Sequence, residues 1–183
     1  MHLLTLLSNY KQEHLSEEEQ ILVERIQDFL KTASQPFHRE HLAGHVTGSA
    51  LIVNPGRTHV LLTHHKKFDK WMQLGGHSDG DEDTLRVAHR EGYEESGLLP
   101  EIIIPVSKNI FDIDVHVTPE RGEEPEHFHY DIRFLFEADD KIPLVISEES
   151  NDLAWKDVQE LLEDTALEAS MRRMLEKITV KNS

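Results

Sequence analysis

The chain has 183 residues and no cysteine, which excludes disulfides, thiolate nucleophiles and cysteine-ligated zinc sites. Acidic residues outnumber basic ones by 35 to 19, and the formal charge of −16 disfavours nucleic-acid backbones and anionic membranes as partners. No apolar run is long enough to span a membrane, and the apolar start lacks the basic flank of a signal peptide. We therefore expect a cytoplasmic protein with one sizeable core.

Two helices are predicted first, at residues 2–9 and 16–32. Ser16 and Glu19 have the spacing of a capping box at the start of the second helix. The apolar residues of that helix recur at helical spacing and form one stripe, made of Ile21, Leu22, Ile26, Phe29 and Leu30. Pro36 ends this pattern, so we expect residues 1–36 to be a helical extension and residues 37–183 to be the main domain.

Strands dominate the chain beyond this point. Residues 48–53 and 59–63 flank the turn Asn54-Pro55-Gly56 and predict a hairpin. The later predicted elements are a helix at about 82–96, a strand at 102–104, a strand pair at about 108–117 and 127–137, and helices near 156–163 and 165–178. This order indicates an α/β protein in which a mixed β-sheet lies between helical layers.

The helix at 82–96 carries an unusual group of charges. Glu91, Glu94 and Glu95 are spaced i, i+3 and i+4, so a helix places the three carboxylates on one side, where they repel one another. A hard divalent cation bound through oxygen would relieve this repulsion. An ordinary solvated acidic face is the alternative interpretation.

The residues around these glutamates favour the cation site. Residues 76–98 resemble the signature of the Nudix (MutT-like) hydrolase family, G-x5-E-x7-R-E-U-x-E-E-x-G-U, in which U is aliphatic. The positions in register are Gly76, Glu82, Arg90, Glu91, Glu94, Glu95, Gly97 and Leu98. The one departure is Gly92, which stands at an aliphatic position and removes an apolar contact without changing a candidate ligand.

The resemblance implies a Nudix-type α/β/α sandwich over about residues 40–178. It also implies hydrolysis of a nucleoside diphosphate linked to another moiety, with Mg²⁺ or Mn²⁺ as cofactor. In this interpretation the metal ligands are Glu91, Glu94, Glu95 and the carbonyl of Gly75. Within the signature, Glu82 and Arg90 are expected to form a structural salt bridge, and Gly76 and Gly97 to serve backbone geometry.

The general base is left open by the sequence. A carboxylate that is not fully committed to metal would take the proton of the attacking water. The candidate catalytic residues are Glu91, Glu95 and, outside the helix, Glu149 or its neighbour Glu148.

A second polar cluster is predicted on the strand pair. The strand 127–137 alternates, so one of its faces carries His127, His129, Asp131 and Arg133, and the strand before it similarly carries Asp112, Asp114 and His116. If the strands pair, these faces merge into a site made of His116, His127, His129 and Asp131. Such a site could hold a transition metal, line a polar substrate pocket or simply face solvent.

The implied substrate is a small phosphorylated molecule, derived from a nucleotide. The cationic groups best placed to meet its phosphates are Arg39, Lys66, Lys67 and Lys70, although each is also typical of an ordinary surface. His77 is close enough in sequence to the glycine pair to contact the substrate as well. The N-terminal helices could pack on a second copy to give a homodimer.

Two other functions on this fold are alternatives to hydrolysis, and the sequence favours neither. A ligand-binding regulator without catalysis would be expected to lose the metal carboxylates, which this chain retains. An isoprenoid diphosphate isomerase relies on an active-site cysteine, which this chain lacks.

Overall fold

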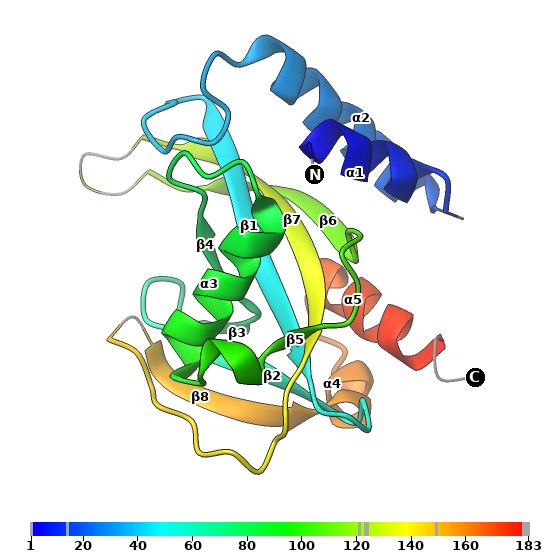
Figure 1. Cartoon of the computed structure of the whole chain (residues 1–183), viewed down its shortest axis with the longest axis vertical. Coiled ribbons are helices and arrows are strands. Elements are labelled where there is room, and N and C mark those ends of the chain that lie inside the picture. The colour runs from blue at the N-terminus through cyan, green and yellow to red at the C-terminus, as the bar shows by residue number, and fades with distance from the viewer. Residues whose placement is uncertain (1, 14, 121, 123–124, 149, 181–183) are drawn as a thin grey trace. The chain divides into compact units, whose positions relative to one another are not determined.

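The computed structural model describes residues 2–13, 15–120, 122, 125–148 and 150–180. The helices, shown in Figure 1, are α1 (Leu3–Lys11), α2 (Glu17–Thr32), α3 (Thr84–Ser96), the 3-10 turn η1 (Pro100–Ile102), α4 (Val158–Glu163) and α5 (Ala169–Val180). The strands are β1 (Gly44–Val53), β2 (His59–His65), β3 (Lys70–Met72), β4 (Leu74–His77), β5 (Ile104–Pro105), β6 (Asp112–Thr118), β7 (His127–Glu137) and β8 (Ser150–Asp157).

Within the described residues, these eight strands form one sheet. The strand order is β3-β2-β1-β7-β5, with β4 paired to β1, β6 to β7 and β8 to β2. This confirms the predicted α/β class. No helix in the same part of the chain is long and apolar enough to cross a membrane.

The chain divides into two compact units, each built from three segments. The first comprises Met1–Ser49, Gly75–Ala88 and Ser107–Phe134, and the second comprises Ala50–Leu74, His89–Val106 and Leu135–Ser183. Three long elements, β1, α3 and β7, contribute residues to both units. The extension at residues 1–36 and the domain at residues 37–183 stay predictions.

The first unit begins with the two predicted helices. The capping box of α2 is confirmed, since Ser16 Oγ accepts from the Glu19 amide at 3.2 Å and Glu19 Oε2 accepts from the Ser16 amide at 3.0 Å. The Tyr10 hydroxyl donates to Glu19 Oε1 at 2.7 Å. Glu19 therefore both caps α2 and joins it to α1.

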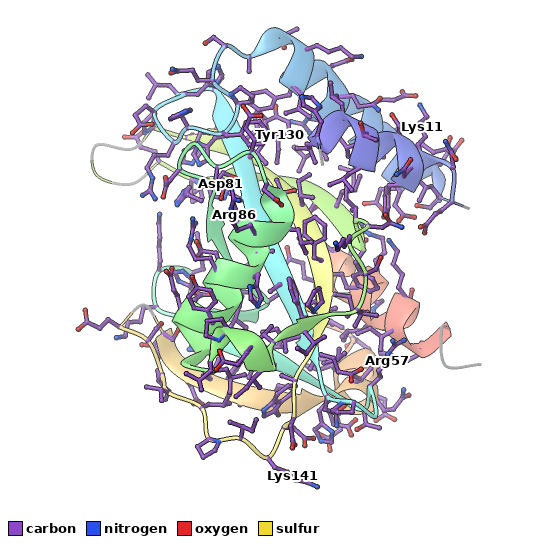
Figure 2. The ribbon with its side chains drawn as sticks, viewed as in Figure 1. Lys11, Arg57, Asp81, Arg86, Tyr130 and Lys141 are labelled. Carbon is purple, nitrogen blue, oxygen red and sulfur yellow. The ribbon has the colours of Figure 1, made fainter. Side chains whose placement is uncertain are left out.

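The apolar stripe of α2 lies slightly off the predicted one. Val23, Ile26 and Phe29 are buried, whereas Ile21 is 63% exposed, so its inclusion in the stripe was wrong. Positions 23, 26 and 29 are three residues apart, and this spacing turns Ile21 outward. Phe29 stacks on Tyr130, which is labelled in Figure 2, with ring centroids 3.9 Å apart.

The strand pair of the first unit is confirmed. β6 and β7 run antiparallel, and the register pairs Asp112 with Arg133, Asp114 with Asp131 and His116 with His129. β6 begins at Asp112, four residues later than predicted. The polar residues of the two strands therefore meet on one face of the sheet, as expected.

The hairpin of the second unit is also confirmed, since β1 and β2 pair antiparallel through Ile52 with Leu61 and Val53 with Val60. The other edge of β2 pairs with β8, a strand that the sequence analysis missed. A helix was expected from residue 156, but Asp157 is the N-cap of α4 and its side chain accepts from the Gln159 and Glu160 amides.

The strand predicted at residues 102–104 was largely wrong. A 3-10 turn occupies Pro100–Ile102, and β5 contains only Ile104 and Pro105. Proline lacks an amide donor and favours the first turn of a helix, which explains why the apolar run does not continue as a long strand. Ile103 is buried and Ile104 is exposed.

Candidate functional site

The three glutamates of the signature lie in the last two turns of α3. Their side chains differ in exposure, because Glu91 is 16% exposed, Glu94 is 55% exposed and Glu95 is buried. Arg90 Nη2 donates to Glu91 Oε1 at 2.7 Å, and Arg90 Nε lies 3.8 Å from Glu94 Oε2. One guanidinium therefore offsets part of the charge of the three carboxylates, and its partnership with Glu82 stays a prediction.

Gly97 ends α3 directly after these glutamates. Its φ is +68°, and its amide donates to the Tyr93 carbonyl at 3.0 Å, which is the left-handed end typical of a helix. A Cβ at this position would lie 2.5 Å from Val145 Cβ. A side chain here would thus be excluded both by backbone conformation and by packing.

The glycine pair before α3 lies in β4. A Cβ at Gly75 would overlap the side chain of Ser49 on β1, so only glycine allows this close approach. Gly76 and His77 complete the strand. The carbonyl of Gly75 as a metal ligand stays a prediction.

The predicted phosphate-binding cations all have partners. Arg39 makes two hydrogen bonds of 2.6 Å with the Asp79 carboxylate, Lys70 pairs with Glu168 at 3.0 Å, and Lys66 donates to the Glu148 carbonyl at 2.7 Å. At Arg39 and Lys70 a phosphate would compete with an exposed ion pair, which costs little, whereas Lys66 would have to leave a backbone carbonyl. Glu149, the catalytic candidate outside α3, lies outside the described residues.

The polar face of β6 and β7 separates into two clusters. In one, Arg133 donates from Nε to Asp131 at 2.8 Å, from Nη1 to Asp112 at 3.1 Å and from Nη2 to Asp114 at 2.9 Å. Burial alone would lower the pKa of Arg133, but the three carboxylates raise it above its ordinary value. Asp131 also accepts from the Thr47 and Ser49 hydroxyls, so it belongs to this ion network.

The other cluster consists of histidines. His45 of β1, His77 of β4 and His127 and His129 of β7 bring their rings together, and the ring centroid of His45 lies 4.9 Å from each of the other three. His116 of β6 is at the border, with its ring 5.4 Å from that of His129 and its Nδ1 3.4 Å from Asp114. Of the predicted patch, the structure thus groups His116, His127 and His129, and places Asp131 with Arg133.

Two of these histidines are held neutral. Burial, followed by the neighbouring rings of His77 and His127, lowers the pKa of His45 to about 3. Burial, followed by the ring of His116, lowers the pKa of His129 to about 2. Both rings are therefore uncharged at neutral pH.

His45 is the member of this cluster that sequence analysis did not single out. It shares a face of β1 with Thr47 and Ser49, since alternate residues of a strand point the same way. That run of alternating polar residues, within a buried strand, was the available signal. The predicted phosphate contact His77 lies against the rings of His45 and His129.

Comparison with known proteins identifies one family and many solved structures that share its fold. The family model described as NUDIX domain matches residues 44–178. A search of curated proteins found no match.

Three solved structures illustrate the likeness of fold. A C. elegans Ap4A hydrolase, solved as a binary complex, aligns with TM-score 0.59 at 18% identity over 75% of this chain and 96% of that one. The MutT protein from Methanosarcina mazei Go1 aligns with TM-score 0.56 at 20% identity, covering 83% and 99%. The E. coli dihydroneopterin triphosphate pyrophosphohydrolase aligns with TM-score 0.55 at 17% identity, covering 74% and 95%.

Proposed function

The chain belongs to the Nudix family of hydrolases, and from this membership we propose that it hydrolyses a diphosphate linkage in a nucleoside diphosphate derivative, with Mg²⁺ or Mn²⁺ as cofactor. The observation that carries the proposal is the group of carboxylates on the last two turns of α3, where Glu91, Glu94 and Glu95 stand in register with the family signature. Arg90 supplies one positive charge against their three negative ones.

The donor set fits a hard cation. Carboxylate oxygens are the ligands that Mg²⁺ and Mn²⁺ prefer, and the excess negative charge on α3 favours a divalent ion. The residues that would hold it are Glu91, Glu94, Glu95 and the carbonyl of Gly75. When bound, such an ion neutralises diphosphate charge and makes a coordinated water more acidic.

The protein's own contribution is to fix the carboxylates and to accept a proton. The hydrogen bond from Arg90 orients the Glu91 carboxylate, and the burial of Glu95 restricts its side chain. We assign the proton of the attacking water to one of these two, with Glu149 as the candidate from outside the helix. Gly97 keeps the helix from continuing past them.

A small, nucleotide-derived substrate is supported by the names of the similar structures, which act on Ap4A and dihydroneopterin triphosphate. Arg39, Lys66 and Lys70 stay separate candidates for contacts with its phosphates, and each would have to give up its present partner. A cytoplasmic location, supported by the absence of cysteine, and a homodimer belong to the same proposal.

The first test is a hydrolysis assay. The protein, stripped with a chelator, is incubated with a panel of nucleoside diphosphate derivatives, nucleotide sugars and dinucleotide polyphosphates, with Mg²⁺ or Mn²⁺ added back. Turnover of one class should depend on the added ion, and Glu94→Gln and Glu95→Gln should each reduce it by orders of magnitude while the circular dichroism spectrum is unchanged. These substitutions remove ligand charge and keep side-chain size.

Glu176→Gln is the matched control, because Glu176 is an exposed glutamate on α5. It should retain full turnover. Unchanged activity in both α3 variants would refute the assignment of this helix as the metal site. Nucleotide binding without turnover, in the presence of either ion, would instead indicate a ligand-binding regulator.

A further inference from the structure

The histidine cluster of the first unit contains a buried side chain whose polar atoms make no hydrogen bond. His45 is only 3% exposed, and neither of its ring nitrogens has a hydrogen-bond partner. Burying a polar group without a partner is costly, so such a group calls for an explanation. A bound ion would provide one, since it would accept the lone pair of one nitrogen.

Three histidines of the cluster have nitrogens close enough to share one ion. One ring nitrogen from each of His45, His77 and His129 lies within 4.8 Å of the others. His127 Nε2 lies 3.1 Å from His129 Nε2. Zinc–nitrogen bonds of about 2.0–2.1 Å at tetrahedral angles put ligand nitrogens about 3.4 Å apart. His127 Nε2 and His129 Nε2 have nearly this spacing, whereas the nitrogens of His45, His77 and His129 lie up to 4.8 Å apart and would have to move closer on binding.

A hydrogen bond to the backbone fixes the tautomer of the His127 ring. His127 Nδ1 lies 2.7 Å from the Pro125 carbonyl oxygen, which can only accept, so this nitrogen carries the proton. The Nε2 nitrogen then carries the lone pair and accepts a hydrogen bond from His129 Nε2 at 3.1 Å, which an ion bound between the two nitrogens would replace. A histidine ligand whose second nitrogen donates to a backbone carbonyl is the usual arrangement in metal sites.

The protonation of the cluster agrees with this geometry. The lowered pKa values of His45 and His129 keep both rings neutral at physiological pH, and a neutral imidazole is the form that binds metal.

We propose that His45, His77, His127 and His129 bind one transition-metal ion of the zinc class, which joins β1, β4 and β7. Four imidazoles without a carboxylate suit zinc, copper, nickel or cobalt, and not the oxygen-seeking Mg²⁺ or Mn²⁺. Asp131 is excluded because Arg133, Thr47 and Ser49 occupy it. The site uses none of the α3 carboxylates and does not depend on the proposed function.

The test is a titration of chelator-stripped protein with Co²⁺, followed by displacement with Zn²⁺ under calorimetry. We expect the visible absorption of a tetrahedral ion to saturate at one Co²⁺ per chain, and the melting temperature to rise on binding. His45→Leu and His129→Gln should each abolish the absorption and weaken Zn²⁺ binding by more than about 100-fold, because even the loss of an outer-shell partner costs about 10- to 100-fold.

Two controls separate this site from others. The first control, His64→Gln, removes a histidine of β2, in the second unit. The second control combines Glu94→Gln and Glu95→Gln in one protein and removes two α3 carboxylates. Both proteins should keep the cobalt spectrum. Because His45 has unpartnered nitrogens, stripped His45→Leu should melt at or above the temperature of the stripped wild type. If it fails to fold, His129→Gln decides.

Three results would overturn the proposal. The wild-type protein could give no tetrahedral cobalt spectrum, the spectrum could persist in folded His45→Leu and His129→Gln, or it could vanish in the α3 glutamate variants. The last outcome would assign the ion to α3.

Discussion

Two glycines, Gly48 on β1 and Gly92 on α3, differ in whether the packing of the helix against the strand requires them. A Cβ at Gly48 would lie 2.9 Å from both the Thr84 carbonyl oxygen and Val87 Cγ1, so Gly48 is required where the helix backbone comes close. A Cβ at Gly92 would lie 3.4 Å from Ala50 Cβ and at ordinary contact distances from its other neighbours. The departure from the family signature at Gly92 is thus not imposed by packing.

Gly92→Ala should therefore stabilise the protein. Alanine lowers the free energy of the helix by about 0.5–1 kcal/mol relative to glycine and adds an apolar contact with Ala50. Urea unfolding followed by circular dichroism would measure the gain as a higher midpoint at an unchanged slope.

Gly48→Ala is the opposite comparison at the same helix and strand. Its Cβ meets backbone atoms that cannot move aside, so the urea midpoint should fall. Equal effects of the two substitutions would contradict this account of the helix–strand contact.

At the scale of elements, the β6–β7 pair is organised by the buried Arg133. Three carboxylates, those of Asp112, Asp114 and Asp131, point at one guanidinium that is almost fully enclosed. A buried network of this kind is fragile, because the removal of one partner leaves uncompensated charges.

Arg133→Met should lower the free energy of unfolding by about 3–5 kcal/mol, because it removes the positive charge that offsets three carboxylates while the side-chain volume stays similar. Urea unfolding at neutral pH is the measurement. Arg86→Met is the control, because Arg86 pairs with Asp81 at the surface, where Figure 2 labels both residues, and its loss should leave the midpoint in place. A tolerated Arg133→Met would mean that the network does not stabilise the strand pair.

The same elements show how far sequence analysis reaches. The pairing of β6 with β7 could be predicted, because alternation and a connecting loop are local signals. β8 could not, since its partner β2 lies about ninety residues earlier and its apolar residues do not alternate cleanly. The carboxylates of α3 were found because the signature is contiguous, whereas the histidine cluster joins residues 45, 77, 127 and 129, and only the fold brings these together.

For the whole molecule, the dominant feature is a formal charge of −16. Charges of one sign repel in the compact state, and salt screens this repulsion as the Debye length falls from about 30 Å at 0.01 M to about 8 Å at 0.15 M. The melting temperature of chelator-stripped protein should therefore rise as potassium chloride is increased over this range. A fall would indicate that attractive surface pairs outweigh the repulsion.

The central claim is that the α3 carboxylates promote attack of water on a diphosphate. The most direct measurement is hydrolysis of the active panel compound in heavy-oxygen water, with Mg²⁺ or Mn²⁺, by the wild-type protein and by Glu95→Gln. We predict that mass spectrometry will find the label in a phosphate-bearing product of the wild-type protein, and that Glu95→Gln will form this product slower by orders of magnitude. Equal rates of labelled product from the two proteins would contradict the claim.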